Sequence, residues 1–174
     1  MRSLALCALA ALLSVSNVPA QAQGGAEPAD CWERVYPAAH FAKAPGQRVE
    51  RMTFLLHRAL GPAPAGPGRF REGLLTVRLR ADARPGAGQT REVWVYCARR
   101  GARLACQPSF DETPILTVEE RAGGASILLT NRRIHLNPVG YSAEDMAEDA
   151  VKLDPRAGDD VFALTAAPAA ACRR

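Results

Sequence analysis

Several features that would point to a familiar kind of protein are missing from this chain of 174 residues. Aromatic residues make up only 6% of it, and no RNA- or DNA-binding motif occurs, so a nucleic-acid ligand is not expected. The sequence has no Gly-x-Ser-x-Gly nucleophile elbow and no His-x-x-x-His metal pair. Beyond its first twenty or so residues, no hydrophobic run approaches the roughly 20 residues that cross a membrane. The sequence therefore predicts no cofactor and no metal site.

The N-terminus has the organisation of a secretory signal. Arg2 precedes an apolar run from Leu4 to Leu13, and small residues at Ala20 and Ala22 stand where a signal peptidase reads the chain. We expect residues 1–22 to be a signal peptide and residues 23–30 to be a flexible leader. Residues 31–174 are then a single disulfide-stapled domain, periplasmic or secreted, with no transmembrane segment after cleavage.

Four cysteines remain in the expected mature chain, namely Cys31, Cys97, Cys106 and Cys172. An oxidising compartment would pair them, and three connectivities are possible. Because Gly101 and Ala102 fit a two-residue turn, the hairpin around them sets Cys97 opposite Cys106 within disulfide reach. That leaves Cys31 to pair with Cys172. A zinc site is the alternative, although no Cys-x-x-Cys pair is present.

Most of the mature chain alternates apolar and polar residues between Gly, Pro and Asp, a pattern typical of strands. We expect strands at residues 49–57, 74–81, 92–98, 104–107, 115–121, 126–136 and 161–165. A capping box that begins at Ser142 predicts a helix through Val151, and residues 37–43 predict a helical turn. The predicted fold is mainly β: an antiparallel sandwich or small barrel of about six to eight strands with one or two short helices.

Charge is distributed unevenly along the chain. Residues 43–110 carry thirteen Lys and Arg against four Asp and Glu, whereas residues 111–160 carry five against eleven. One interpretation makes the arginines of residues 74–81 and 99–103 a face for an anionic ligand or an acidic partner. The other, which we favour, is that basic strands and acidic segments neutralise one another across the fold.

Residue types that perform catalysis are scattered. The histidines are widely spaced, the acidic clusters lack the ordered spacing of a calcium loop, and the aromatic residues fit simple packing. We therefore assign no catalytic, cofactor-binding or metal-binding residue. The residues weighed on these grounds are His40, His57, His135, Glu33, Glu50, Glu144, Asp145, Glu148, Asp149, Asp154, Asp159, Asp160, Trp32, Trp94 and Tyr96.

Both ends of the expected mature chain carry a distinctive pattern. It comprises Cys31-Trp32-Glu33-Arg34-Val35-Tyr36 with the residues that follow to position 49, then residues 158–164 and a terminal Cys172. This pattern resembles a group of small exported bacterial proteins to which no function is assigned. The resemblance covers nearly the whole mature chain and implies export and a shared fold, but no active-site residue. Around residues 106–110 that group often has an additional cysteine and a glycine-rich turn, from which this sequence departs.

Two functional hypotheses follow. The first is a small, exported, non-enzymatic binding or interaction module for an unknown protein or small ligand, which is anionic if the arginines form a binding face. The second is a small hydrolase or lyase acting on the cell envelope, in which a carboxylate such as Glu33 or Glu50 assists His40 or His57. A histidine, a carboxylate and a hydroxyl in hydrogen-bond contact inside a cleft would favour the second.

Overall fold

The computed structural model describes residues 30–57, 70–82, 86–109, 113–141 and 147–173. Its two α-helices are α1 (Ala38–Lys43), which confirms the expected helical turn, and α2 (Ala169–Cys172), and its two 3-10 turns are η1 (Ala122–Gly124) and η2 (Pro155–Ala157). The strands are β1 (Cys31–Val35), β2 (Val49–Leu56), β3 (Arg71–Leu79), β4 (Thr90–Arg100), β5 (Arg103–Gln107), β6 (Leu116–Arg121), β7 (Ser126–Asn131), β8 (His135–Pro138), β9 (Val151–Lys152) and β10 (Val161–Ala166).

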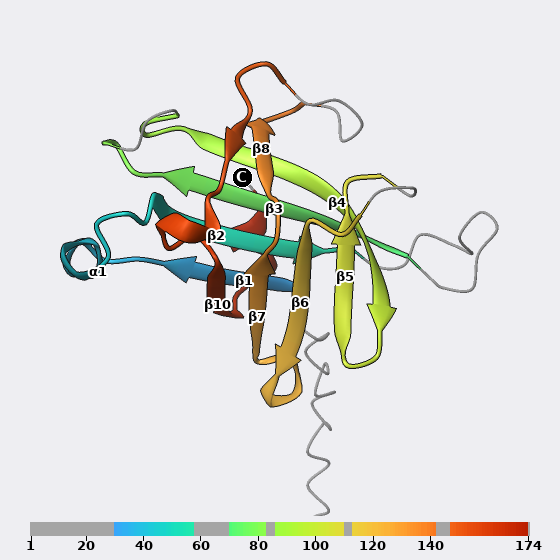
Figure 1. Cartoon of the computed structure of the whole chain (residues 1–174). Coiled ribbons are helices and arrows are strands. Elements are labelled where there is room, and N and C mark those ends of the chain that lie inside the picture. Colours follow the sequence, from blue (N-terminus) through green and yellow to red (C-terminus); the bar gives the residue numbers. More distant parts are fainter. Residues whose placement is uncertain (1–29, 58–69, 83–85, 110–112, 142–146, 174) are drawn as a thin grey trace, which may run out of the picture.

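Eight of these strands close into an antiparallel barrel (Figure 1). Their order is β3, β2, β1, β10, β7, β6, β5 and β4, and β4 pairs again with β3 to close the ring. An eight-stranded barrel has an interior just wide enough for side chains to fill. The mainly β fold is confirmed, and of the two expected architectures the barrel is the one that forms.

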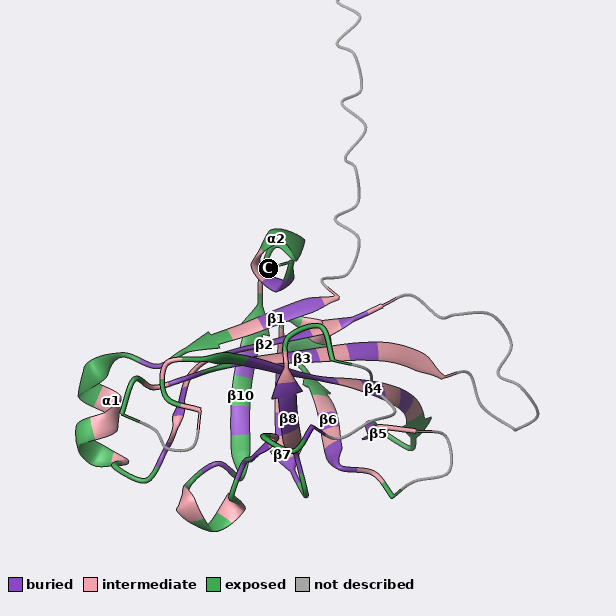
Figure 2. Ribbon diagram, turned by 90° about the horizontal axis from the view of Figure 1, so that it is seen from above, coloured by how far each residue is buried: buried purple, intermediate pink, exposed green. Residues whose placement is uncertain are grey.

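Large apolar side chains at alternate positions of many strands are buried, which gives the bands of colour along the strands in Figure 2. In β2 these are Met52, Phe54 and Leu56, each at most 1% exposed. The packing is tight at Gly73 of β3, where a Cβ atom would lie 3.1 Å from the Phe54 ring and from a Val95 methyl group. Apolar side chains therefore fill the interior of the barrel.

The hairpin of β4 and β5 forms as the sequence predicts. It turns at Gly101, whose φ of 62° favours glycine, and its register places Arg100 opposite Arg103 and Cys97 opposite Cys106. The two cysteines form a disulfide with their Cα atoms 4.0 Å apart.

The second disulfide joins the first strand of the barrel to the last helix. Cys31 of β1 and Cys172 of α2 are bonded, with a Cα–Cα distance of 6.0 Å. Helix α2 packs on the outside of the barrel against β1 and β2, as Figure 2 shows. Both disulfides are the predicted pairs: the turn at residues 101–102 favoured Cys97 with Cys106, which left Cys31 to pair with Cys172.

The single strand expected over residues 126–136 is wrong, because the chain breaks it into β7 and β8. The backbone N–H groups of Arg132 and Arg133 both donate to the Ile115 carbonyl, at 2.9 and 3.0 Å. The N–H of Ile134 donates to Oδ1 of Asn131 at 2.8 Å. These bonds turn the chain, so that β8 pairs instead with one end of β4 and extends the sheet beyond the barrel.

The helix expected from residue 142 through Val151 is wrong in its described part; residues 142–146 lie outside the described residues. Ala147 to Ala150 form a turn closed by a 3.0 Å hydrogen bond, and Val151 begins β9. Val151 lies opposite Leu136 of β8, and both side chains are fully buried. Tertiary burial of an apolar residue outweighs the weak preference for helix here.

Residues 1–29 lie outside the described residues, so the signal peptide and the leader remain predictions. The helices of the described part are too short to span a lipid bilayer. Two disulfides are compatible with a protein of the periplasm or the extracellular space.

Candidate functional site

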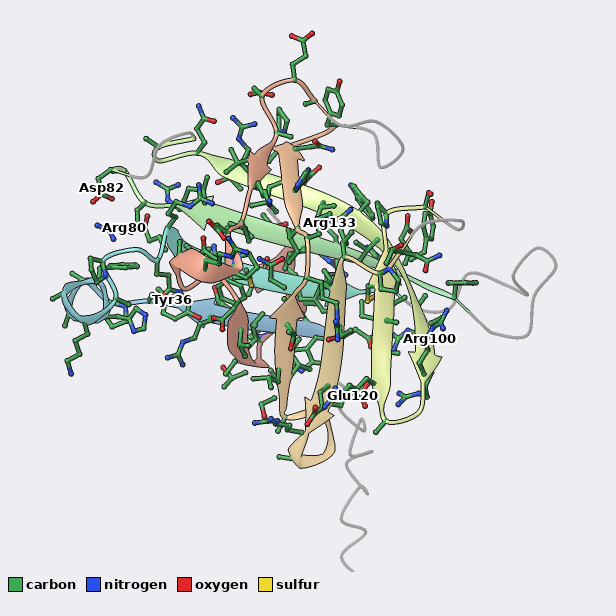
Figure 3. All side chains as sticks on the ribbon, in the orientation of Figure 1. Tyr36, Arg80, Asp82, Arg100, Glu120 and Arg133 are labelled. Atoms are coloured by element: carbon green, nitrogen blue, oxygen red, sulfur yellow. A yellow bond between two sulfur atoms is a disulfide. The ribbon has the colours of Figure 1, made fainter. Side chains whose placement is uncertain are left out.

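The arginines that the sequence singled out are largely engaged with carboxylates. Figure 3 shows Arg80 beside Asp82 at one side of the molecule, and Glu120 near the β4–β5 hairpin at the other. Exposed pairs of this kind neutralise charge and contribute little stability each. For residues 99–103 the partners come from the acidic half of the chain, as in the neutralisation that we favoured, whereas for residues 74–81 the partners Glu50 and Asp82 belong to the basic half itself. The pairs are Arg78 with Glu50, Arg80 with Asp82, Arg99 with Glu120 and Arg103 with Glu119.

Cationic side chains without a carboxylate partner gather at another place. They surround a hollow of about 360 Å³, which we call the basic hollow. All four cations are exposed, and none forms an ion pair within the described residues. Figure 3 labels one of them, Arg133, well away from both Arg80 and Arg100. The lining residues are Arg132, Arg133, Lys152, Asp154, Pro155 and Arg156.

Two separate segments build the basic hollow. The connection between β7 and β8 supplies Arg132 and Arg133, and the segment from β9 into η2 supplies Lys152 and Arg156. Asp154 is the single carboxylate of the lining, and its Oδ1 accepts the backbone N–H of Arg156 at 2.9 Å to begin the 3-10 turn. The hollow therefore presents four positive side chains against one negative side chain that already caps a turn.

A buried asparagine ties the two segments together. Asn131 is 4% exposed, and its Nδ2 donates to the carbonyl of Leu153 at 3.0 Å and to that of Asp159 at 2.7 Å. Its Oδ1 accepts the N–H of Ile134 at 2.8 Å. All the hydrogen-bonding groups of one amide are thus used to hold the backbone of both walls in place.

The positive potential of this region acts on a neighbouring histidine. His135 of β8 lies opposite Lys152 of β9. Partial burial, followed by the charges of Lys152 and Arg133, lowers the pKa of His135 below its usual 6.5. A bound anion would offset these two charges and raise the pKa again.

An ion pair holds the backbone of the segment from β9 into η2, which forms one wall of the basic hollow. Asp159 is fully buried, and its carboxylate accepts the backbone N–H and the Nε–H of Arg48, both at 3.4 Å. Nη2 of the same arginine donates to the carbonyl of Lys152. Burial raises the pKa of the Asp159 carboxyl above its ordinary value, and the contacts with Arg48 offset this only in part.

Because the pKa of Asp159 is higher in the folded chain than in the unfolded chain, ionising it costs folding free energy. We expect an Asp159→Asn variant to gain stability relative to the wild type as the pH rises from about 4 through the folded-state pKa, and to keep a constant difference outside that window. Urea denaturation of both proteins between pH 3 and pH 8 measures this. The opposite slope, with the wild type gaining stability over this range, would show that Arg48 outweighs burial.

The three histidines lie on different elements. In α1, His40 shares a hydrogen bond between its Nε2 and Oε1 of Gln47. His57 follows β2 and stacks on Trp94, with ring centroids 5.7 Å apart. His135 lies in β8, beside the basic hollow.

The carboxylates of the enzyme hypothesis are engaged by arginines. Glu33 pairs with Arg51, and Glu50 pairs with Arg78 at 3.5 Å. Catalysis by a histidine and a carboxylate would need the two groups in hydrogen-bond reach. The contacts of the described residues do not bring Glu33 or Glu50 to a histidine.

Several of the remaining sequence candidates have structural roles, and others lie outside the described residues. Trp32 packs in the core beside Phe54, and its Nε1–H donates to the Gly124 carbonyl at 2.8 Å. Asp149 accepts from Arg91 at 2.9 Å. Glu144 and Asp145 are not described, and among the residues that the structure describes no group of His, Cys, Asp or Glu is placed to hold a metal ion.

A second hollow, of about 340 Å³, lies on the outer face of β2 and β3 beside α2. Its two cations, Arg51 and Arg78, are each paired with a glutamate. The hydroxyl groups of Thr53 and Thr76 line it with them. Since its charges are already matched, the basic hollow is the stronger candidate site.

Comparisons of the chain with protein-family models, with curated proteins and with solved structures find no match. The basic hollow therefore has to be interpreted from its own chemistry. Sequence reasoning missed it because its cations belong to the half of the chain in which acidic residues predominate. One signal was present: Asn131, Arg132 and Arg133 interrupt the apolar alternation of the strand expected there.

Proposed function

We propose that this protein is an exported, non-enzymatic binding module that works in the periplasm or outside the cell and takes an anionic ligand at the basic hollow. One observation carries the proposal: four exposed cations without ion pairs in the described residues surround a hollow that contains a single carboxylate. Side chains of one sign around a concave surface focus the potential and raise the local concentration of ions of the opposite sign.

Preorganisation of the backbone supports the same proposal. The hydrogen bonds of Asn131 fix both walls of the hollow in the absence of a ligand. The Ile115 carbonyl, which accepts from the N–H groups of Arg132 and Arg133, holds one wall further. A site that is already ordered loses less conformational entropy on binding. Only the exposed ends of the arginine and lysine side chains then have to be ordered.

Export rests on the N-terminal signal pattern, on the resemblance to small exported bacterial proteins and on the disulfides. A closed barrel stapled at two places withstands an environment without cytosolic chaperones, because the cross-links limit the entropy of the unfolded chain. The barrel is then a rigid support, and the basic hollow is the surface that binds the ligand.

Binding of small anions to the purified protein tests the function. We would titrate citrate, orthophosphate and pyrophosphate by calorimetry into the wild type, an Arg132→Gln/Arg133→Gln variant and a control, Arg99→Gln/Arg103→Gln. Both variants lose two positive charges, but the control loses them from arginines that already have carboxylate partners. We expect the first variant to weaken binding of the best anion about tenfold or more, since two charge-assisted hydrogen bonds are lost, and the control to change it by less than about twofold.

Equal losses in the two variants would mean that anions respond only to net charge, and the proposal would fail. It would also fail if none of the three anions bound to the wild type.

A further inference from the structure

The cations of the basic hollow are divided evenly between its two walls. Arg132 and Arg133 come from the β7–β8 connection, and Lys152 and Arg156 come from β9 and η2. Each pair can neutralise one anionic group. A ligand with a single negative group would therefore leave one pair of like charges unmatched, at a cost in electrostatic repulsion.

The size of the hollow agrees with more than one group. Its volume of about 360 Å³ falls in the range of sites for small organic ligands. Asn131 holds the backbone of both walls at fixed positions, so only the flexible ends of the four cationic side chains adjust to a ligand.

The donor types favour phosphate over carboxylate. A planar carboxylate accepts hydrogen bonds in one plane, whereas a tetrahedral phosphate offers oxygens in several directions. Three guanidinium groups and one ammonium group that reach a hollow from two walls can engage such oxygens together. Asp154, the single acid of the lining, directs Oδ1 to the backbone N–H of Arg156.

We propose that the basic hollow recognises a diphosphate, with one phosphate group held by Arg132 and Arg133 and the other by Lys152 and Arg156. This inference rests on the proposed function and names the chemical class of its ligand. The diphosphate is recognised either as the free ion or as the end group of a larger ester.

His135 provides a reporter that is not part of the lining. The charged groups that act on it are Arg133, at the end of the β7–β8 connection, and Lys152, across the β8–β9 ladder. A diphosphate that matches both charges removes their effect on the imidazole. The pKa of His135 then rises on binding, which can be followed by the NMR signals of the ring.

The test compares anions of similar charge. At pH 7.5 and constant ionic strength, inorganic pyrophosphate and citrate carry a similar negative charge, so calorimetry with the two separates phosphate chemistry from charge alone. We expect pyrophosphate to bind about tenfold more tightly than citrate and about tenfold more tightly than orthophosphate. The Lys152→Gln/Arg156→Gln variant should reduce binding of pyrophosphate to the level of orthophosphate, because one wall is lost.

A fourth ligand, farnesyl diphosphate, shows whether the protein recognises the free diphosphate ion or a diphosphate ester. Equal affinity for the ester and for pyrophosphate supports recognition of the diphosphate alone, and tighter binding of the ester supports a lipid-type diphosphate. If citrate binds as tightly as pyrophosphate, and the Arg132→Gln/Arg133→Gln variant loses both, the diphosphate inference is overturned while the anion-binding function stands. If no anion binds to the wild type, both are overturned.

Discussion

Replacing Cys31 and Cys172 together by serine is expected to lower the free energy of unfolding by about 5 kcal/mol, because the disulfide closes nearly the whole domain into one loop. The two residues are 141 positions apart in the sequence. In the unfolded chain, a link of that length removes more conformational entropy than a short one. Without it, helix α2 keeps its packing on β1 and β2 and a 3.2 Å bond from Nη2 of Arg51 to the Ala171 carbonyl.

The second disulfide provides the matched control. Cys97 and Cys106 are 9 positions apart and join neighbouring strands that the hairpin already holds together. Replacing this pair by serine is expected to cost about 2.7 kcal/mol by the same loop-closure entropy. Guanidinium denaturation of the three oxidised proteins measures both values. A greater loss from the Cys97/Cys106 change than from the Cys31/Cys172 change would contradict the account.

An Asn131→Ala variant is expected to lose about 3 kcal/mol of stability, because three buried hydrogen bonds disappear at once. Two of them hold the carbonyls of Leu153 and Asp159, and the third satisfies the N–H of Ile134. Truncation leaves these backbone groups buried without their partner. The walls of the basic hollow then lose their common support, so we also expect pyrophosphate to bind at least about threefold more weakly at temperatures where the variant is still folded.

Thr130 supplies a control for this truncation. It precedes Asn131 in β7 but is only half-buried on the outer face of the strand. A Thr130→Ala change is expected to alter stability by less than about 1 kcal/mol and to leave binding unchanged. Urea denaturation and calorimetry report the two effects separately. If Asn131→Ala lowered stability without affecting binding, its bonds would support the barrel and not the site.

Local chemistry explains what the sequence could predict about the fold. The β4–β5 hairpin follows from a glycine turn flanked by alternating residues, and its symmetry alone brings Cys97 opposite Cys106. In β10 the same alternation separates Phe162 and Leu164 from Val161 and Ala163, and the first two are fully buried whereas the other two are exposed. Such patterns depend only on neighbours in the chain.

Long-range pairing explains what the sequence could not predict. Strand β1 is short and lies between β2, the next strand along the chain, and β10, which comes near the other end of the domain. Strand β9 has two residues, and only its position beside β8 makes it a strand. No local pattern favours either of them over a turn or a helix.

The basic hollow could not be predicted from the sequence for the same reason. Its two pairs of cations are about twenty positions apart in the sequence, and acidic residues predominate around them. The larger set of arginines between residues 43 and 110 suggested a binding face, but most of those described form ion pairs. Net charge along the sequence therefore does not reveal the basic hollow, because it does not show which charges are matched in space.

An NMR titration of the isotope-labelled protein with pyrophosphate tests the central claim most directly, since it locates the bound anion. The account predicts saturable shifts of the backbone amides of Arg132, Arg133, Lys152 and Arg156 and a rise in the pKa of His135, with the amides of residues 99–103 unmoved. Shifts that are spread over the arginines of β4 and β5, or that fail to saturate, would contradict a specific anion-binding site at the basic hollow.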